Sequence, residues 1–259
     1  MTGMRVIVLG GSGNLGGHVL AALRVDGHEA VGASRRTGVD IATGAGLGAV
    51  MVGADAVVHC ADTLRPWEFG RVTVGGTRAV AKAMAGLDEP PHLVYISIVG
   101  VDRHPSRYYR AKFAAEMELR AAGIPATVVR ATQFHSLVAA MARAHVGPLG
   151  VGVAGFRAQP VDIAWVGRRL AEIATGPAPD GFARHPDLAG PEVLDAATVA
   201  DLVAAHEGRT VTRRLDLPPI GRTLRAFAGG AVLPGPDAET GGESFAQWLD
   251  AQPDRLPRR

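Results

Sequence analysis

Residues 6–20 read Val6-Ile7-Val8-Leu9-Gly10-Gly11-Ser12-Gly13-Asn14-Leu15-Gly16-Gly17-His18-Val19-Leu20, and this stretch decides the fold of the chain. It joins an apolar strand pattern to an amphipathic helix pattern without a break. Glycine stands at positions 10, 13 and 16 of the turn between them. Such a turn lets backbone N–H groups and a helix N-terminus surround a pyrophosphate. We therefore predict a dinucleotide site formed by Gly10, Ser12, Gly13, Asn14, Leu15 and Gly16.

The three spaced glycines have separate roles in this prediction. Gly10 takes the tight turn, Gly13 leaves room for phosphates beside the backbone, and Gly16 lets the helix pack closely on the strand. The alternative is a strand–helix turn that binds nothing. The place of the turn, directly after an apolar N-terminal strand, disfavours that alternative.

Length and composition indicate an ordinary globular protein. A chain of 259 residues suits one large α/β domain or a domain with a smaller appendage. The 27 basic and 25 acidic residues nearly balance, so the charge gives no reason to expect nucleic acid as a partner. Cys60 is the single cysteine, which excludes an internal disulfide and fits a cytoplasmic protein. We expect no membrane span, because no apolar run reaches about 18 residues, and no signal peptide, because the chain enters the first strand almost at once.

Strand and helix patterns alternate through the first half. This order predicts an α/β fold, a Rossmann-like doubly wound parallel sheet. The expected strands are 5–9, 30–33, 39–41, 56–60, 93–97 and 126–130, and the expected helices are 14–24, 46–52, 76–85 and 108–122.

The pattern loosens after about Thr132, where proline and glycine become frequent. We expect residues 1–135 to form the dinucleotide-binding domain and residues 136–259 a smaller substrate lobe packed on it. The boundary is approximate, and the two parts can interleave. Helices are expected at 163–174, 196–206 and 243–250, followed by a frayed tail from 253 to 259.

The end of the second strand indicates which dinucleotide is bound. NAD sites place a carboxylate there for the ribose 2′-hydroxyl, but this chain has Ser34, Arg35 and Arg36. Guanidinium groups suit a 2′-phosphate, so the prediction is NADP(H) in preference to NAD(H). The alternative is that the two arginines are a solvated loop face. Asp40 and Ile41, the next residues with a predicted role, would lie near the adenine.

Further cofactor contacts are expected where neighbouring strands end. Cys60, Ala61 and Asp62 follow the fourth strand, and Ser97 ends the fifth, along the edge where open α/β sheets bind ligands. His59 and Cys60 are interpreted as strand packing residues, since no partner at metal-binding spacing accompanies them. No metal site is predicted.

The helix from 108 to 122 carries the candidate catalytic pair. Tyr108 and Lys112 are four residues apart and share one helix face. The ammonium would lower the pKa of the phenol and could hydrogen-bond the nicotinamide ribose, so Tyr108 could exchange a proton with a substrate oxygen. The alternative is an ordinary helix with a packed tyrosine. Tyr109 is expected to be a packing residue or part of the substrate wall.

These segments together resemble the short-chain dehydrogenase/reductases of the atypical, NmrA-like NAD(P)-binding group. The resemblance rests on 10–16, 34–36, 55–59, 94–100, 108–116, 123–134, 159–163 and 188–192.

The resemblance implies roles for particular residues. It carries nucleotide contacts onto the glycine turn, Ser34–Arg36, Ala61 and Lys112, and it makes Tyr108 and Lys112 the catalytic pair. A serine or threonine in catalytic relatives holds the substrate carbonyl; Ser97 either fills this role or only caps its strand. Some members of the group bind NADP(H) as sensors and catalyse nothing.

The substrate is expected between the nicotinamide end and the second lobe. Gln133, Phe134 and His135 follow the sixth strand and are candidate substrate contacts, with Phe134 also near the nicotinamide. A loop packed under the lobe is the alternative. The prediction is an NADP(H)-dependent oxidoreductase acting on a small, fairly apolar carbonyl, hydroxyl or quinone-like substrate. The alternative is a non-catalytic NADP(H) sensor, and a nucleotide-sugar epimerase or dehydratase ranks lower. The sequence leaves open whether the protein is a monomer or a homodimer.

Overall fold

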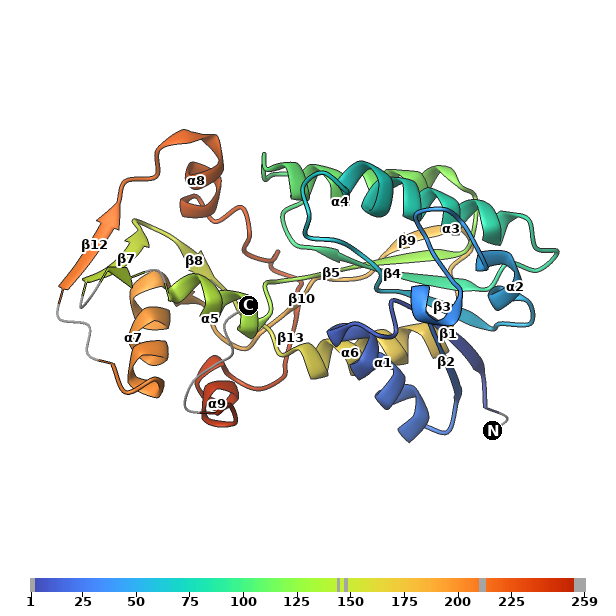
Figure 1. The fold of residues 1–259 in the computed structure, drawn as a ribbon, viewed down its shortest axis with the longest axis horizontal. Coiled ribbons are helices and arrows are strands. Elements are labelled where there is room, and N and C mark those ends of the chain that lie inside the picture. The colour runs from blue at the N-terminus through green and yellow to red at the C-terminus, as the bar shows by residue number, and fades with distance from the viewer. Residues whose placement is uncertain (1–2, 144, 147–148, 210–212, 254–259) are drawn as a thin grey trace.

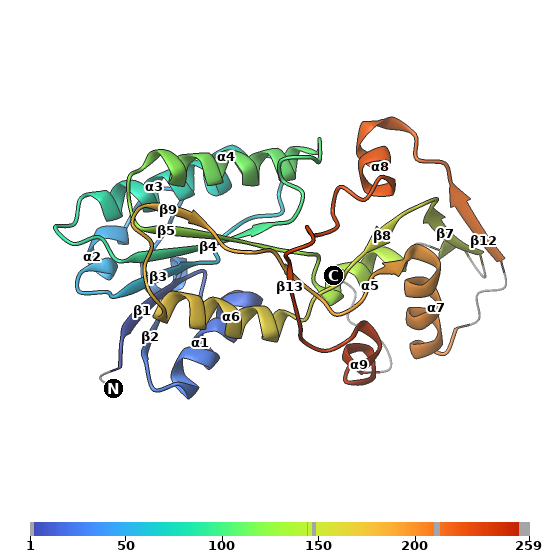
Figure 2. The same ribbon diagram turned by 180° about the vertical axis from the view of Figure 1, so that it is seen from behind.

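The computed structural model describes residues 3–143, 145–146, 149–209 and 213–253. The molecule is elongated and has two parts (Figure 1). The larger part is a sheet with helices on both faces, and the smaller part holds short helices and strands. The same two parts lie side by side when the molecule is viewed from behind (Figure 2).

A parallel sheet forms the centre of the larger part. In the described residues it has eight strands, and all of their pairings are parallel. In spatial order they are β13 (Glu239–Thr240), β10 (Leu188–Ala189), β5 (Ala126–Ala131), β4 (His92–Ile98), β3 (Ala56–His59), β1 (Arg5–Leu9) and β2 (Glu29–Ala33), with β9 (Phe182–Arg184) also paired to β5. This is the Rossmann-like architecture that the sequence predicts.

Helices cover both faces of this sheet (Figure 1). One face carries α2 (Leu47–Met51), α3 (Gly75–Ala85) and α4 (Arg107–Ala121), and the other carries α1 (Asn14–Val25) and α6 (Ile163–Thr175). Successive residues of a strand point to opposite faces, so apolar residues at every position of β1 fill two cores. Ile7 and Leu9 face the α3–α4 side, and Val6 and Val8 face the α1–α6 side.

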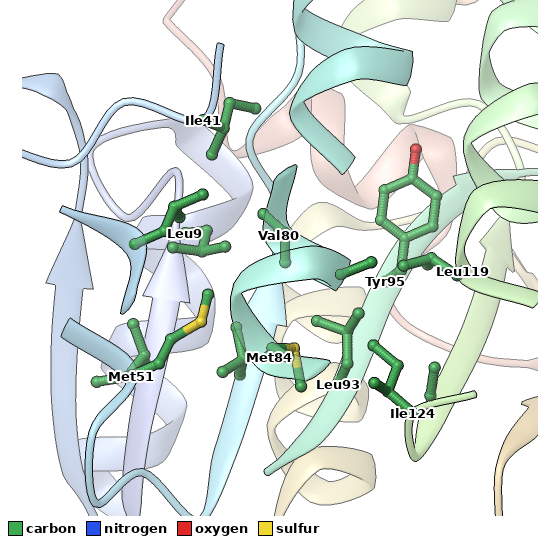
Figure 3. Close-up of a cluster of buried hydrophobic side chains, with 14 of the residues drawn as sticks. Leu9, Ile41, Met51, Val80, Met84, Leu93, Tyr95, Leu119 and Ile124 are labelled. Carbon is green, nitrogen blue, oxygen red and sulfur yellow. The ribbon is translucent and has the colours of Figure 1, made fainter. Parts of the chain in front are cut away.

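The core on the α3–α4 side is the larger of the two (Figure 3). Leu93 and Tyr95 of β4 lie in it with Met84 of α3 and Leu119 of α4, and each is at most 1% exposed. A fully buried leucine or methionine stabilises the fold by roughly 1.5–3 kcal/mol. These contacts fix α4, and therefore Tyr108 and Lys112, over the carboxyl ends of β3 and β4.

The smaller part has its own core. Val138, Val203 and Phe245 lie in it and are at most 1% exposed. Its elements are α5 (His135–Ala142), β6 (His145–Val146), β7 (Leu149–Val153), β8 (Arg157–Ala158), β11 (Leu194–Asp195), α7 (Ala196–His206), β12 (Arg213–Leu217), α8 (Gly221–Ala228) and α9 (Phe245–Asp250).

The two parts interleave along the chain, an arrangement that the sequence analysis allowed. Helix α6 and strands β9, β10 and β13 all follow residue 135 but belong to the larger part. Asp162 begins α6, because its carboxylate accepts hydrogen bonds from the N–H groups of Ala164 and Trp165 at 2.9 and 3.0 Å. Residues 254–259 of the tail predicted to be frayed lie outside the described residues.

One predicted strand is wrong. Residues 39–41 do not join the sheet, because Asp40 forms only an isolated bridge with Ala45. The chain turns instead through η1 (Arg35–Thr37), a short 3₁₀ helix that ends at Gly38 with φ 82°. The other predicted elements form with ends within two residues of those expected.

Candidate functional site

The glycine turn brings three chain segments together. Gly10 has φ 80°, and a Cβ on it would lie 2.7 Å from the backbone nitrogen of Ala61. Its own N–H donates to the carbonyl oxygen of Ala33 at 2.9 Å. A Cβ on Gly16 would overlap the Gly10 carbonyl, so only glycine allows α1 to start this close to β1. Gly13 is the N-cap residue of α1. No side chain caps the first N–H groups of α1, which fits a pyrophosphate there.

A cavity of about 620 Å³ opens beside this turn. Most of the predicted cofactor residues line it, and the structure therefore brings together segments from the ends of β1, β2 and β3. These residues are Gly10, Ser12, Gly13, Ser34, Arg35, Arg36, Asp40, Ile41, Cys60, Ala61 and Asp62.

The side of this cavity that lies after β3 was not predicted from the sequence. It is lined by Thr63, Leu64, Arg65, Glu68, Arg71 and Val72, from the loop after β3 and from η2 (Phe69–Val74), a π-helical segment. The Glu68 carboxylate lies 3.7 Å from Arg65 and 3.3 Å from Arg71. A hydrogen bond from Thr63 and the nearby arginines lower the pKa of Glu68. The available signal was two arginines in the segment that follows β3, Arg65 in the loop and Arg71 in η2.

The two arginines at the end of β2 also face this cavity. Their 3₁₀ helix is closed by two bonds: the Thr37 N–H donates to the Ser34 carbonyl oxygen, and the Ser34 N–H donates to Thr37 Oγ1, both at 2.9 Å. Asp40 is the first carboxylate after them, and one of its oxygens accepts the Ala42 N–H at 2.9 Å. The cavity wall at β2 is therefore cationic.

Tyr108 and Lys112 lie on the same face of α4 and meet at one carboxylate. The Tyr108 hydroxyl donates to Asp62 Oδ2 at 3.0 Å, and Lys112 Nζ lies 3.2 Å from the same oxygen. Lys112 Nζ also donates to the Ile96 carbonyl oxygen at 2.7 Å and lies 4.3 Å from the centre of the Tyr95 ring. The pair thus stands at the ends of β3 and β4, beside the cavity that Asp62 lines.

Asp62 is held from several sides. Its Oδ1 accepts the Thr73 hydroxyl at 2.6 Å and the Thr63 N–H at 2.8 Å. Thr73 lies on η2, whose Phe69 ring packs against Tyr108 with centroids 5.4 Å apart. The sequence predicted Asp62 only as a cofactor contact. Its position in the chain, far from α4, gave no signal that it contacts Tyr108 and Lys112.

The charges in this cluster shift the three pKa values in different directions. Burial raises the pKa of Tyr108 above its ordinary value, and Asp62 raises it further, against the opposite effect of Lys112. The expected lowering of this pKa is therefore wrong, because the carboxylate and burial outweigh the ammonium. Burial alone would lower the pKa of Lys112, but Asp62, Tyr95 and Tyr108 together outweigh burial, and the pKa is raised. The pKa of Asp62 is lowered: burial opposes this, and Lys112 and the hydrogen bonds outweigh burial.

Comparison with protein families gives a match over residues 6–137, to the NAD dependent epimerase/dehydratase family. The chain belongs to this family. The matched region runs from β1 to α5 and contains the glycine turn, the arginines of η1, Asp62 and the Tyr108–Lys112 pair. It is therefore a Rossmann-like protein of an NAD(P)-binding superfamily.

Solved structures share this fold at low sequence identity. An NADPH-dependent quinone oxidoreductase from Escherichia coli, complexed with NADPH, has a TM-score of 0.72 and 15% identity, and the match covers 95% of this chain and 98% of that one. A dTDP-4-dehydrorhamnose reductase from Bacillus anthracis, in complex with NADP, has a TM-score of 0.67 and 16% identity over 96% and 97% of the two chains. A UDP-N-acetylglucosamine 4-epimerase from Bacillus cereus has a TM-score of 0.66 and 14% identity over 95% and 94%.

A curated relative matches a shorter stretch. An uncharacterized protein of Mycobacterium tuberculosis is 38% identical over 96 residues, which are 32% of this chain and 11% of the relative. The match thus spans about a tenth of the length of that relative.

Three predicted site residues line neither the cavity beside the glycine turn nor a second cavity, which Phe134 and His135 line. Ser97 is fully buried, and its Oγ has no hydrogen-bond partner among the described residues. Tyr109 packs against His104, with ring centroids 4.2 Å apart, and against Phe227 of α8. Burial raises the pKa of Tyr109 to about 12. Gln133 is 9% exposed. Their substrate roles stay predictions.

Phe134 and His135 line a second cavity, of about 420 Å³. Asn14 of the glycine turn also lines it, but Tyr108 and Lys112 do not. His135 Nε2 donates to the Glu243 carbonyl oxygen at 3.0 Å, and its ring packs against Phe245 and Trp248 of α9. The second cavity thus lies between the glycine turn and the smaller part. Leu15 and Gly16 line neither cavity.

Among the described residues, no three His, Cys, Asp or Glu side chains gather closely enough to hold a metal ion. His59 is buried and bonds Thr77 at 3.2 Å, and burial lowers the pKa of His59 to about 3. Burial also raises the pKa of the Cys60 thiol to about 12. No helix in the described ranges has the length and apolarity needed to cross a membrane.

Proposed function

We propose that the chain is an NADP(H)-dependent oxidoreductase that transfers a hydride between the dinucleotide and a small, fairly apolar carbonyl, hydroxyl or quinone-like substrate. One observation carries the proposal: Tyr108 and Lys112 meet at Asp62, on the wall of the cavity beside the glycine turn. A titratable hydroxyl and a fixed ammonium next to a nucleotide cradle are what proton transfer coupled to hydride transfer requires.

The residues present fit the dinucleotide. Gly10, Ser12 and Gly13 of the turn line the cavity, and no side chain caps the first N–H groups of α1, which suit its pyrophosphate. Arg35 and Arg36 suit a 2′-phosphate, and the end of β2 offers no carboxylate to a 2′-hydroxyl. The proposed cofactor is therefore NADP(H) in preference to NAD(H). When bound, it supplies the hydride.

The protein would supply position and a proton. Lys112 is held by the Ile96 carbonyl and by Asp62, so its ammonium has a fixed place from which to bond the nicotinamide ribose. Tyr108 would give its hydroxyl proton to the substrate oxygen, and Phe69 of η2 would keep the phenol ring in place. Phe134 follows β5 at the same edge of the sheet and is the proposed apolar contact near the nicotinamide.

The test is NADPH consumption by the purified full chain with a panel of aldehydes, ketones and quinones. We expect turnover on at least one class. Tyr108→Phe should lower kcat/KM by about 10²–10⁴-fold, because it removes the general acid. Lys112→Ala should weaken NADPH binding, whereas Lys82→Ala, which removes an exposed lysine of α3, should change neither quantity.

One observation favours a second candidate, a non-catalytic NADP(H) sensor. Asp62 accepts a hydrogen bond from the Tyr108 hydroxyl in the protein alone, so this hydrogen bond must break before Tyr108 can protonate a substrate. Tight NADPH binding without turnover on any member of the panel would support the sensor and contradict the enzyme.

A further inference from the structure

The loop after β3 places a carboxylate directly against the candidate proton donor. Asp62 Oδ2 accepts the Tyr108 hydroxyl at 3.0 Å and lies 3.2 Å from Lys112 Nζ. Both Oδ1 bonds, from Thr63 and Thr73, are 2.8 Å or shorter. Four partners thus hold one carboxylate in a single position, and its side chain is 20% exposed.

This contact favours one protonation state of Tyr108. A carboxylate accepts a hydrogen bond from a phenol, but it repels a phenolate at the same distance. The Lys112 ammonium would stabilise a phenolate, yet its charge is already matched by Asp62. The titratable groups around Tyr108 are Asp62 from the loop after β3, Lys112 on its own helix and the uncharged phenol of Tyr95 on β4. From η2, the uncharged ring of Phe69 packs against the Tyr108 ring.

We propose that Asp62 is a positioning residue that keeps Tyr108 protonated and so sets the site for reduction of aldehydes and ketones at neutral pH. This inference rests on the proposed function and adds a direction and a substrate class to it. Alcohol oxidation needs a base at Tyr108, and a phenol is not one. Carbonyl reduction needs an acid there, and the phenol is already in that form.

The reduction step balances with the groups named. The carbonyl carbon accepts a hydride from the reduced dinucleotide, and the π electrons of the C=O bond move to its oxygen. That oxygen takes the Tyr108 proton, and the product is an alcohol. Tyr108 is left as a phenolate beside Lys112 and regains its proton from water.

The same contact distinguishes carbonyl substrates from quinones. Reduction of an aldehyde or ketone develops alkoxide character, and an alkoxide is a much stronger base than a phenolate. Even a phenol weakened by Asp62 therefore protonates it readily. Reduction of a quinone develops a phenolate-type oxygen, which gains far less from this donor. We therefore expect aldehydes and ketones to depend on Tyr108 more strongly than quinones do.

The direct test is ionisation of Tyr108 in the full chain without cofactor. The sequence has three tyrosines, so tyrosinate formation can be followed by ultraviolet absorbance or by NMR of ¹³C-labelled tyrosine rings. Asp62→Asn should move one tyrosine transition down by about one pH unit or more, since it removes the carboxylate charge. The double variant Asp62→Asn with Tyr108→Phe should lose that transition. Asp88→Asn, an exposed carboxylate before β4, is the matched control and should shift nothing.

Kinetics give a second measurement. In Asp62→Asn the alkaline limb of ketone reduction should move to lower pH, and alcohol oxidation at neutral pH should become faster. Asp62→Ala serves if the asparagine variant does not fold. An unchanged Tyr108 titration in folded variants overturns the inference even if wild type reduces ketones. A shifted titration with turnover of quinones but of no aldehyde or ketone also overturns the inference and leaves the proposed function standing. A shifted titration with no turnover of any carbonyl, hydroxyl or quinone substrate overturns both.

Discussion

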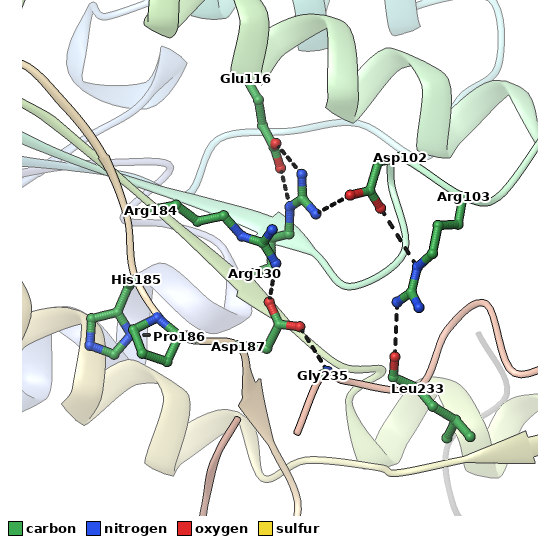
Figure 4. A network of polar contacts seen from close by, with 10 residues as sticks. All are labelled: Asp102, Arg103, Glu116, Arg130, Arg184, His185, Pro186, Asp187, Leu233 and Gly235. Atoms are coloured by element: carbon green, nitrogen blue, oxygen red, sulfur yellow. Dashed lines mark hydrogen bonds and ion pairs between the residues drawn. The ribbon is translucent and has the colours of Figure 1, made fainter. Parts of the chain in front are cut away.

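Arg130 and Glu116 form a buried pair joined by two parallel hydrogen bonds, 2.9 Å from Nε to Oε1 and 2.7 Å from Nη2 to Oε2 (Figure 4). Their side chains are 6% and 3% exposed. Arg130 Nη1 also donates to Asp102 at 2.9 Å, and Arg103 next to it donates to the Leu233 carbonyl oxygen at 3.0 Å. The pair ties β5 to α4, the helix that carries Tyr108 and Lys112, and its neighbours reach the segment after α8.

Glu116→Ala should lower the free energy of unfolding by up to about 3–5 kcal/mol, because it removes the buried carboxylate of the pair and leaves the Arg130 guanidinium with only the more exposed Asp102. Chemical denaturation measures this. Glu118→Ala is the matched control on the same helix: Glu118 bonds Arg78 in the same two-bond geometry, but at the surface, where water screens the pair. Equal losses in the two variants would contradict a structural role for burial of the Arg130 pair.

Gly10→Ala should abolish tight dinucleotide binding and destabilise the fold by at least about 1 kcal/mol, since a side chain at positive φ is strained. The added Cβ would also lie 2.7 Å from the Ala61 nitrogen. Gly17→Ala is the control: a Cβ there meets nothing within 4 Å, and alanine favours the helix. Binding by fluorescence titration and unfolding by denaturant report both effects. Tight dinucleotide binding by Gly10→Ala would contradict the assignment of the glycine turn to the dinucleotide site.

Arg35→Ala and Arg36→Ala should weaken NADPH binding by about 10–100-fold in the variant that loses the main 2′-phosphate contact, since a charge-assisted hydrogen bond contributes about 1.5–3 kcal/mol. NADH binding should change little. Calorimetric dissociation constants for both dinucleotides decide this. Equal affinity of wild type for NADPH and NADH, unaltered by either substitution, would contradict the proposed preference.

The Asp62–Lys112 contact should make stability depend on pH at both extremes. The pKa of Asp62 is lowered in the folded chain, so its contribution is present above the ordinary aspartate pKa and is lost as pH falls through the folded value. The pKa of Lys112 is raised, so its contribution is present below the ordinary lysine pKa and is lost as pH rises through the folded value. The difference in unfolding free energy between wild type and Asp62→Asn should therefore be flat between about pH 4 and 10. A maximum near pH 7 that falls on both sides would contradict this.

Much of the larger part could be predicted from local patterns. The glycine turn and the apolar strands of the parallel sheet can be recognised from short stretches of sequence. In the structure these strands end within two residues of the predicted positions. The prediction of a strand at 39–41 was wrong, because a segment of three residues is too short for its pattern to distinguish a strand from a turn. The interleaving of α6 with the first part depends on contacts with α1, which no local pattern reports.

The site was predicted less completely, for a physical reason. Spacing on one helix correctly placed Tyr108 and Lys112 together, because helical periodicity is local. Their contact with Asp62 joins residues 46 positions apart, so it depends on how α4 lies over the end of β3. The same holds for Tyr109, whose packing against Phe227 comes from a helix more than a hundred residues later.

The most direct test of the proposed hydride transfer follows deuterium from the dinucleotide to the substrate. The full chain is incubated with NADPH carrying deuterium at the transferable position of the nicotinamide ring, together with an aldehyde or ketone turned over in the panel, and the alcohol is examined by mass spectrometry. We predict one deuterium on the carbinol carbon, formed about 10²–10⁴-fold more slowly by Tyr108→Phe. An alcohol without deuterium, or labelling at the same rate in Tyr108→Phe, would contradict the account.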